Sequence, residues 1–160
     1  MDVRTALPSD MEEIMDMCRS LHEENGLFPM NEERVRSVID MALQRKGGIL
    51  GVIGNAGKIE GMIYIMICQH WSSEEWHLEE LFAYVKPEFR GMGPANKLLK
   101  FAKKCAKELN MALIIGIVSN TRTESKVSLY KKQFGSPRGN FFVYNSRWDT
   151  SDGFSMNGHG

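Results

Sequence analysis

The stretch Val85-Lys86-Pro87-Glu88-Phe89-Arg90-Gly91-Met92-Gly93-Pro94-Ala95 decides the fold, because it joins a predicted strand to a predicted helix. Glycines at 91 and 93 allow the main chain to approach a ligand closely. The unpaired N–H groups and the positive dipole end of the first helical turn point outward at the same place. Such a loop favours an anion, and a diphosphate suits it. The alternative interpretation is that the glycines only make a tight strand-to-helix turn.

Upstream of this loop, the hydrophobic pattern predicts two helices followed by antiparallel strands. The helices show apolar residues at helical spacing, whereas from residue 49 onward the apolar residues are mostly β-branched. In order, the predicted elements are a short strand at Val3, a helix capped by the Ser9-x-x-Glu12 pattern, a helix capped by Asn31, and strands at 49–53, 59–67 and 76–85. Residues 55–58 have the composition of a hairpin turn.

Downstream of the loop, the pattern alternates between helix and strand. A helix with an inward stripe that includes Leu98 and Ala102 is followed by the apolar run 112–118. We expect that run to be a central strand buried on both faces. A helix at 121–134 and a strand at 140–144 complete a β-α-α-β-β-β-α-β-α-β series, which predicts an α/β fold with a mixed sheet and helices on both faces.

Length and composition fit one domain of a globular protein. The 160 residues divide into a predicted domain at 1–146 and an extension at 147–160 that is rich in Ser, Asp, Asn and Gly. Lys plus Arg equals Asp plus Glu at 20 each, so we expect neither nucleic acid nor an anionic membrane as a partner. There is no signal-peptide pattern and no apolar run of membrane-span length, which favours a cytoplasmic location.

The loop and its surroundings resemble the GNAT superfamily of acetyltransferases. The signature of that superfamily is Gln/Arg-x-x-Gly-x-Gly/Ala between the fourth strand and the third helix, and here it reads Arg90 to Ala95. The element order over about residues 2–145 is similar, and Val85-x-Pro87 precedes the signature. Asn120 and the run Ser128-Leu129-Tyr130 follow the fifth strand, as in the family. The resemblance implies a mixed central sheet of six or seven strands flanked by about four helices.

The resemblance also implies acetyl-CoA as co-substrate. In the family, main-chain amides of the loop hold the CoA pyrophosphate, and the pantetheine arm lies in the splay between strands four and five. The cofactor-binding residues implied here are Tyr84, Val85, Arg90, Gly91, Met92, Gly93, Ala95, Asn96, Asn120 and Tyr130. Pro94 departs from a full set of donors because it has no N–H, so we expect either a lower affinity for the cofactor or compensation by Asn96.

Attack of an amine on a thioester requires a base, usually a carboxylate or a histidine, and the predicted strand 76–85 offers His77, Glu79 and Glu80. Glu79 and Glu80 point to opposite faces unless a bulge intervenes, so parity alone does not choose between them. We favour Glu80 because Glu80-Leu81-Phe82-Ala83-Tyr84-Val85 resembles the Glu-Leu-Phe-x-x-Val of phage-encoded members, with Glu79 as the alternative. Ordinary solvation is the competing explanation for either carboxylate.

Tyr130 matches the family tyrosine that gives a proton to the departing CoA thiolate. The competing interpretation is that its ring only packs under the sheet. We expect no metal site, because the four histidines show no ligand spacing with one another or with Cys18, Cys68 and Cys105.

The predicted reaction is transfer of an acetyl group to a primary amine by direct attack in a ternary complex. The alternative is a catalytically silent GNAT-like module that binds CoA or serves a structural role. The acceptor is expected to be a small-molecule or protein amine that enters past residues 23–30, whose carboxylates suit a cation. A homodimer is compatible with the resemblance.

Overall fold

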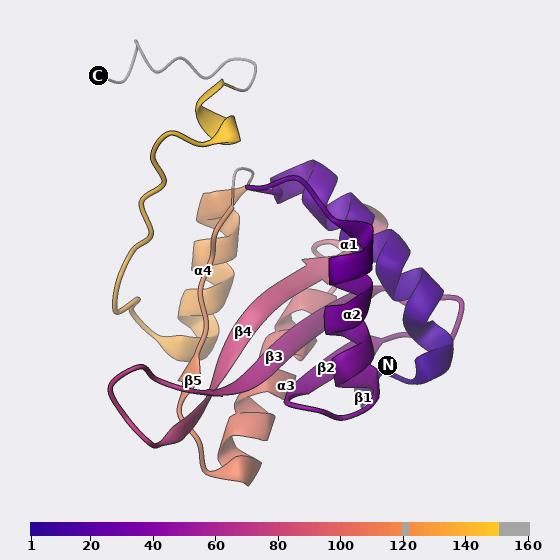
Figure 1. Ribbon diagram of the computed structural model, residues 1–160, viewed down its shortest axis with the longest axis horizontal. Helices are drawn as coiled ribbons and strands as arrows, with labels where there is room; N and C mark the ends of the chain where they lie inside the picture. The colour runs from indigo at the N-terminus through magenta and orange to yellow at the C-terminus, as the bar shows by residue number, and fades with distance from the viewer. Residues whose placement is uncertain (120–121, 151–160) are drawn as a thin grey trace.

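The computed structural model describes residues 1–119 and 122–150, and its strands form one mixed sheet (Figure 1). The strands are β1 (Val3–Thr5), β2 (Gly48–Ile53), β3 (Gly61–Gln69), β4 (Trp76–Val85) and β5 (Leu113–Ile114). The helices are α1 (Met11–Asn25), α2 (Glu32–Leu43), α3 (Pro94–Leu109) and α4 (Thr123–Phe134), with short 3-10 turns η1 (Pro8–Asp10), η2 (Pro87–Phe89) and η3 (Arg147–Thr150). The predicted α/β class and the four helices are confirmed.

The strands lie in sequence order, β1 to β5. The first four pair antiparallel with their neighbours, whereas β5 runs parallel to β4. That parallel ladder joins only Leu78 to Leu113 and Glu79 to Ile114. Beyond Glu79, therefore, the edge of β4 that faces β5 is not paired with it.

Helices cover both faces of the sheet (Figure 1), and an apolar cluster lies on each face. One cluster packs α1 and α2 against residues such as Val52, Met62 and Tyr64. The other packs α3 against Ile63, Ile65 and Leu78, with residues of α4 at its margin. Alternation along β3 explains the division, because successive strand residues point to opposite faces. In the part of the chain described here, no helix has the length and apolarity to cross a membrane.

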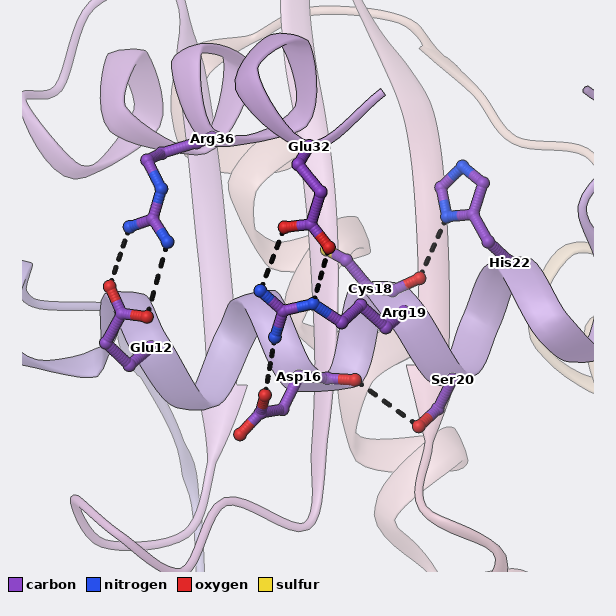
Figure 2. Close-up of polar contacts among 8 residues, drawn as sticks. All are labelled: Glu12, Asp16, Cys18, Arg19, Ser20, His22, Glu32 and Arg36. Carbon is purple, nitrogen blue, oxygen red and sulfur yellow. Dashed lines mark hydrogen bonds and ion pairs between the residues drawn. The ribbon is translucent and has the colours of Figure 1, made fainter. Parts of the chain in front are cut away.

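Ion pairs join α1 to α2 on the surface (Figure 2). Arg19 binds Glu32 through two hydrogen bonds, and Arg36 reaches Glu12 in the same manner. Asn31 caps α2 by accepting a hydrogen bond from the N–H of Arg34 at 2.9 Å, which confirms the predicted cap.

The predicted capping box at the start of the first helix is wrong. Ser9 lies in η1, and α1 begins at Met11 after Asp10. The Asp10 carboxylate is buried, and it accepts hydrogen bonds from Arg4 and from the N–H of Leu7. The buried Asp10 carboxylate accepts these hydrogen bonds and fixes the chain just before α1. A capping box of Ser9 and Glu12 is therefore not required to start the helix.

The prediction of six or seven strands is wrong for the described residues, which contain five. The run 112–118 is not central: only Leu113–Ile114 pairs, at the edge of the sheet, and Ile114 and Val118 are exposed. Residues 140–144 form no strand, and Phe142 is 93% exposed. Residues of high strand propensity form a strand only where a neighbouring strand pairs with them, and β5 is too short to provide that partner.

Candidate active site

The β4–α3 loop occupies the position that the sequence predicts, with η2 in between. Gly91 and Gly93 adopt φ values of +79° and +107°, a region that disfavours residues with a side chain. A β-carbon added at either glycine would meet no atom within 4 Å. The glycines therefore serve the backbone turn and leave open space above the loop, as a ligand would require.

The loop presents main-chain donors to that space. Arg90 and Met92 donate their N–H groups to the carbonyls of Pro87 and Phe89. Over residues 1–119 and 122–150, no main-chain carbonyl accepts from the N–H groups of Gly91, Gly93, Ala95 or Asn96. These four donors, at the N-terminus of the 16-residue helix α3, suit a phosphate group. Pro94 contributes none, as its ring requires.

Arg90 is held in place at the mouth of this loop. Its Nε donates to the carbonyl of Val85 at 2.9 Å, and its Nη2 forms an ion pair with Glu24 of α1 at 2.6 Å. The guanidinium also lies 5.5 Å from the centre of the Tyr84 ring. Arg90 therefore ties the loop to α1, and Glu24 neutralises part of its charge.

A cavity of about 280 Å³ lies between α1, β4, α3 and α4. Three cationic residues line it, namely Arg90, Arg122 and Lys126, together with the carboxylate of Glu24. Burial lowers the pKa of Lys126, whose Nζ donates to Ser119 at 2.7 Å. The excess of cationic residues over carboxylates suits an anionic ligand such as a diphosphate.

The free edge of β4 also lines the cavity, at Ala83 and Val85. Lys86 donates its N–H to Glu60 at 2.9 Å, which places residues 86 and 60 in a hydrogen-bonded pair of the β3–β4 ladder. Main-chain groups alternate between the two sides of an antiparallel strand, so the N–H of Val85 points away from β3. It points into the splay between β4 and β5, where a ligand can pair with it.

Strand β4 contains a β-bulge at Leu81. Tyr64 pairs with Phe82 and Ile65 pairs with Glu80, which leaves Leu81 as an extra residue. Because the bulge follows Glu80, Glu79 and Glu80 still point to opposite faces. Glu80 lies on the α3–α4 face, whereas Glu79, paired with Met66, lies on the α1–α2 face.

Glu80 and Tyr130 of α4 contact each other directly. The Tyr130 hydroxyl donates to Oε2 of Glu80 at 3.1 Å. Burial raises the pKa of Glu80 to about 8, although the Tyr130 hydrogen bond opposes this shift. Burial, and secondarily the Glu80 charge, raise the pKa of Tyr130, so the phenol stays protonated. The pair combines a carboxylate poised near neutral pH with a protonated phenol.

The structure brings most of the predicted cofactor residues to one region. Tyr84, Val85, Arg90, Gly91, Ala95 and Tyr130 line the cavity. Met92 is 71% exposed on the loop, and the Asn96 side chain accepts a hydrogen bond from Gln133. Asn120 lies outside the described residues. Glu79 is separated from Tyr130 by the sheet. The assignment of these residues to cofactor binding and catalysis stays a prediction, as does the boundary between residues 146 and 147.

Sequence reasoning missed two features of the structure. Glu24, Arg122 and Lys126 reach the cavity from α1 and α4, and only the tertiary packing reveals this. Cys68, His77 and Glu79 converge on the other face of the sheet. Spacing along the chain hides this cluster, but pairing the predicted strands 59–67 and 76–85 as a hairpin would have placed Cys68 near His77.

Comparison with solved structures finds relatives of the whole fold at low sequence identity. A possible acetyltransferase from Clostridium difficile 630 aligns with a TM-score of 0.70 at 17% identity, over 90% of this chain and 96% of that chain. An aminoglycoside 6'-N-acetyltransferase from Acinetobacter haemolyticus aligns with a TM-score of 0.67 at 15% identity, over 92% and 98% of the two chains. AAC(6')-Iy, solved in complex with the bisubstrate analogue CoA-S-monomethyl-acetylneamine, aligns with a TM-score of 0.67 at 14% identity, over 91% and 97%.

The search of curated protein sequences finds no match. In contrast, residues 11–135 match the Acetyltransferase (GNAT) family. The match spans most of the chain, including α1, β2 to β5 and the β4–α3 loop. Together with the signature at Arg90–Ala95 and the mixed five-stranded sheet, it places this chain in the GNAT acetyltransferase family.

Proposed function

We propose that this protein transfers an acetyl group from acetyl-CoA to a primary amine, by direct attack in a ternary complex. The observation that carries the proposal is the hydrogen bond from the Tyr130 hydroxyl to the Glu80 carboxylate. It joins a candidate acid and a candidate base beside the cavity that the β4–α3 loop borders. Membership of the GNAT acetyltransferase family supports the reaction class.

The donors of the loop fit the diphosphate of CoA. The N–H groups of Gly91, Gly93, Ala95 and Asn96 have no main-chain acceptor within the described chain, and the space above both glycines is open. Arg122 and Lys126 supply positive charge nearby. The pantetheine arm would follow the unpaired edge of β4, where the Val85 N–H is available to polarise a carbonyl. Acetyl-CoA supplies the activated acyl group when bound.

The two side chains provide a complete proton path. Ionised Glu80 accepts a proton from the attacking amine, and Tyr130 donates its hydroxyl proton to the departing sulfur. The hydrogen bond between them then returns a proton from Glu80 to Tyr130. The net result is that the proton lost by the amine ends on the thiol, and both side chains regain their starting states.

The acceptor amine would enter near the α1–α2 connection. A second cavity of about 440 Å³ lies there between Leu27–Pro29 and residues 143–147. Glu24 is paired with Arg90, whereas the exposed Glu23 forms no ion pair within residues 1–119 and 122–150 and could attract a cation. The relatives that act on aminoglycosides make amino sugars one class to test, beside polyamines and protein lysines.

The proposal is tested by measuring release of free CoA thiol from acetyl-CoA with a panel of these amines. We expect Glu80→Gln and Tyr130→Phe to lower kcat by about 100-fold or more. Glu33→Gln, on the exposed side of α2, is the matched control and should keep wild-type turnover.

The pH dependence provides a second test of the same pair. With an acceptor amine whose own pKa lies far from 8, kcat/KM should rise with an apparent pKa of about 8, as Glu80 ionises. The Glu80→Gln variant should lack this rise. Binding of acetyl-CoA without turnover on any amine, unchanged by either substitution, would instead support a silent CoA-binding module.

A further inference from the structure

A thiol, an imidazole and a carboxylate meet on the face of the sheet opposite Glu80. Cys68 lies near the end of β3 and pairs across the hairpin with His77 of β4. Glu79 is two residues further along β4, so its side chain lies on the same face as that of His77. All three residues are at least partly buried: His77 is 8% exposed, and Cys68 and Glu79 are intermediate.

The three polar atoms lie at nearly equal distances from one another. The distances are 3.5 Å from Cys68 Sγ to His77 Nε2, 3.2 Å from Sγ to Glu79 Oε2, and 3.4 Å from Nε2 to Oε2. Tetrahedral zinc, with bonds of about 2.3 Å to sulfur and about 2.0–2.1 Å to nitrogen and oxygen, holds a sulfur ligand about 3.5–3.6 Å from a nitrogen or oxygen ligand, and nitrogen about 3.3–3.4 Å from oxygen. The Sγ–Nε2 and Nε2–Oε2 distances therefore match one face of a zinc tetrahedron, and the Sγ–Oε2 distance is about 0.3 Å shorter.

The same geometry argues against a catalytic thiol. In a nucleophilic relay, the carboxylate binds the imidazole nitrogen that lies away from the nucleophile. Here Glu79 Oε2 contacts the same Nε2 that faces Cys68, and it also accepts a hydrogen bond from the thiol. Among residues 1–119 and 122–150, no lysine or arginine forms an ion pair with Glu79. The three groups are thus arranged around a common point instead of in a line.

We propose that Cys68, His77 and Glu79 bind one zinc ion. A neutral imidazole, a thiolate and a carboxylate carry two negative charges and balance the dication, and this mixed sulfur, nitrogen and oxygen set suits zinc. Binding releases the Cys68 thiol proton to solvent. Since the Glu79 side chain is 44% exposed, a water completes the fourth position. The ion would join β3 to β4 next to the hairpin at residues 70–75.

The test is a calorimetric titration of the reduced, chelator-treated full chain with zinc chloride. We expect one zinc per chain, and a Kd raised by more than about 100-fold in Cys68→Ser, His77→Gln and Glu79→Gln. The matched controls are Cys105→Ser, a half-buried cysteine on α3, and Glu75→Gln, an exposed carboxylate in the same hairpin. Both should bind like the wild type.

Two spectroscopic and chemical readouts keep the test independent of folding defects. Cobalt(II) should produce a thiolate-to-cobalt absorption band that is absent in Cys68→Ser, a variant whose fold is checked by circular dichroism. Zinc should protect Cys68, but not Cys105, from alkylation by iodoacetamide. Failure of zinc to bind the wild type, or binding that Cys68→Ser leaves unchanged, would overturn the site.

Discussion

At the scale of single residues, Glu80 links the candidate chemistry to stability. Its carboxyl group lies between the sheet and α4, where burial raises its pKa to about 8 from an ordinary value of 4.5. Tyr130 donates a hydrogen bond to it but does not remove the cost of burying a charge. The same environment that prepares a base near neutral pH therefore makes the folded state sensitive to pH.

We predict that Glu80→Gln stabilises the protein at alkaline pH. Between pH 4.5 and 8 the folded state retains a proton that the unfolded state has lost, so the free energy of unfolding of the wild type falls as pH rises through this window. The wild type loses about 1.4 kcal/mol of unfolding free energy for each unit of difference between the folded and unfolded pKa of Glu80. The neutral amide of Glu80→Gln does not titrate, so the variant does not lose this free energy. Urea unfolding at pH 4 and pH 8.5 checks this. An equal difference between the two proteins at both pH values would contradict it.

Gly93 is the second residue whose conformation bears on function. We predict that acetyl-CoA raises the Tm of the wild type and that Gly93→Glu abolishes the rise, because a carboxylate there would repel the diphosphate. Gly57→Glu is the matched control, since Gly57 also has a positive φ and open space around its β-carbon but lies in the β2–β3 turn. Differential scanning fluorimetry measures the Tm of both variants with and without acetyl-CoA. If Gly93→Glu retained the rise in Tm, the cofactor would not bind at the β4–α3 loop.

At the scale of elements, the start of α1 depends on one ion pair, in which the Asp10 carboxylate is buried and the Arg4 side chain is partly exposed. Asp10 accepts two hydrogen bonds from Arg4 of β1, at 2.8 and 3.0 Å, and a third from Leu7. These hydrogen bonds hold the pKa of Asp10 below its ordinary value of 3.8, and the contact with Arg4 makes the largest contribution. In contrast, the α1–α2 pairs of Figure 2 are exposed to solvent and to screening by salt.

We predict that Asp10→Asn lowers the free energy of unfolding at pH 7 by about 1–3 kcal/mol, because Arg4 loses its charged partner. Arg36→Ala, which removes one exposed pair, should cost less. The contribution of Asp10 is present above its unfolded pKa and is lost as pH falls through the folded one. Chemical denaturation at pH 7 and at pH 2.5 tests both statements. Equal losses for the two variants at pH 7 would contradict the distinction.

At the scale of the whole molecule, the two apolar clusters stabilise the sheet from both sides. Ile39 of α2 and Ile63 of β3 are fully buried in different clusters. Phe142, in contrast, is 93% exposed although it belongs to an apolar run. Sequence hydrophobicity alone would rank these three residues together.

We predict that Ile39→Ala and Ile63→Ala each cost about 2–5 kcal/mol of unfolding free energy, through lost contacts and the cavities they leave. Phe142→Ser should change it by less than about 0.5 kcal/mol. Guanidinium unfolding of the three variants is the measurement. A large loss of unfolding free energy in Phe142→Ser would contradict the exposed position of Phe142 and would mean that its ring packs against the protein in solution.

Local patterns were enough to identify the helices, the hairpin strands, the limits of β4 and the glycine loop. They succeed because helical and strand periods, caps and turn residues are encoded in neighbouring positions. The resemblance to the GNAT family depends on known motifs, above all the signature at Arg90–Ala95 within one short loop, together with the element order. Asn31, which both the pattern and the structure place at the start of α2, is one example.

The failures concern partners that are distant along the chain. The run 112–118 has the composition of a central strand, yet it lies at the edge because no further strand of the described chain, residues 1–119 and 122–150, pairs with it. Glu79 and Glu80 lie on opposite faces because the bulge comes after Glu80 and leaves the alternation at these two residues intact, and Cys68 meets His77 because of the β3–β4 pairing register. Composition identifies which side chains are available for chemistry. Only strand pairing and packing determine which of them meet, because those contacts are set by the whole chain.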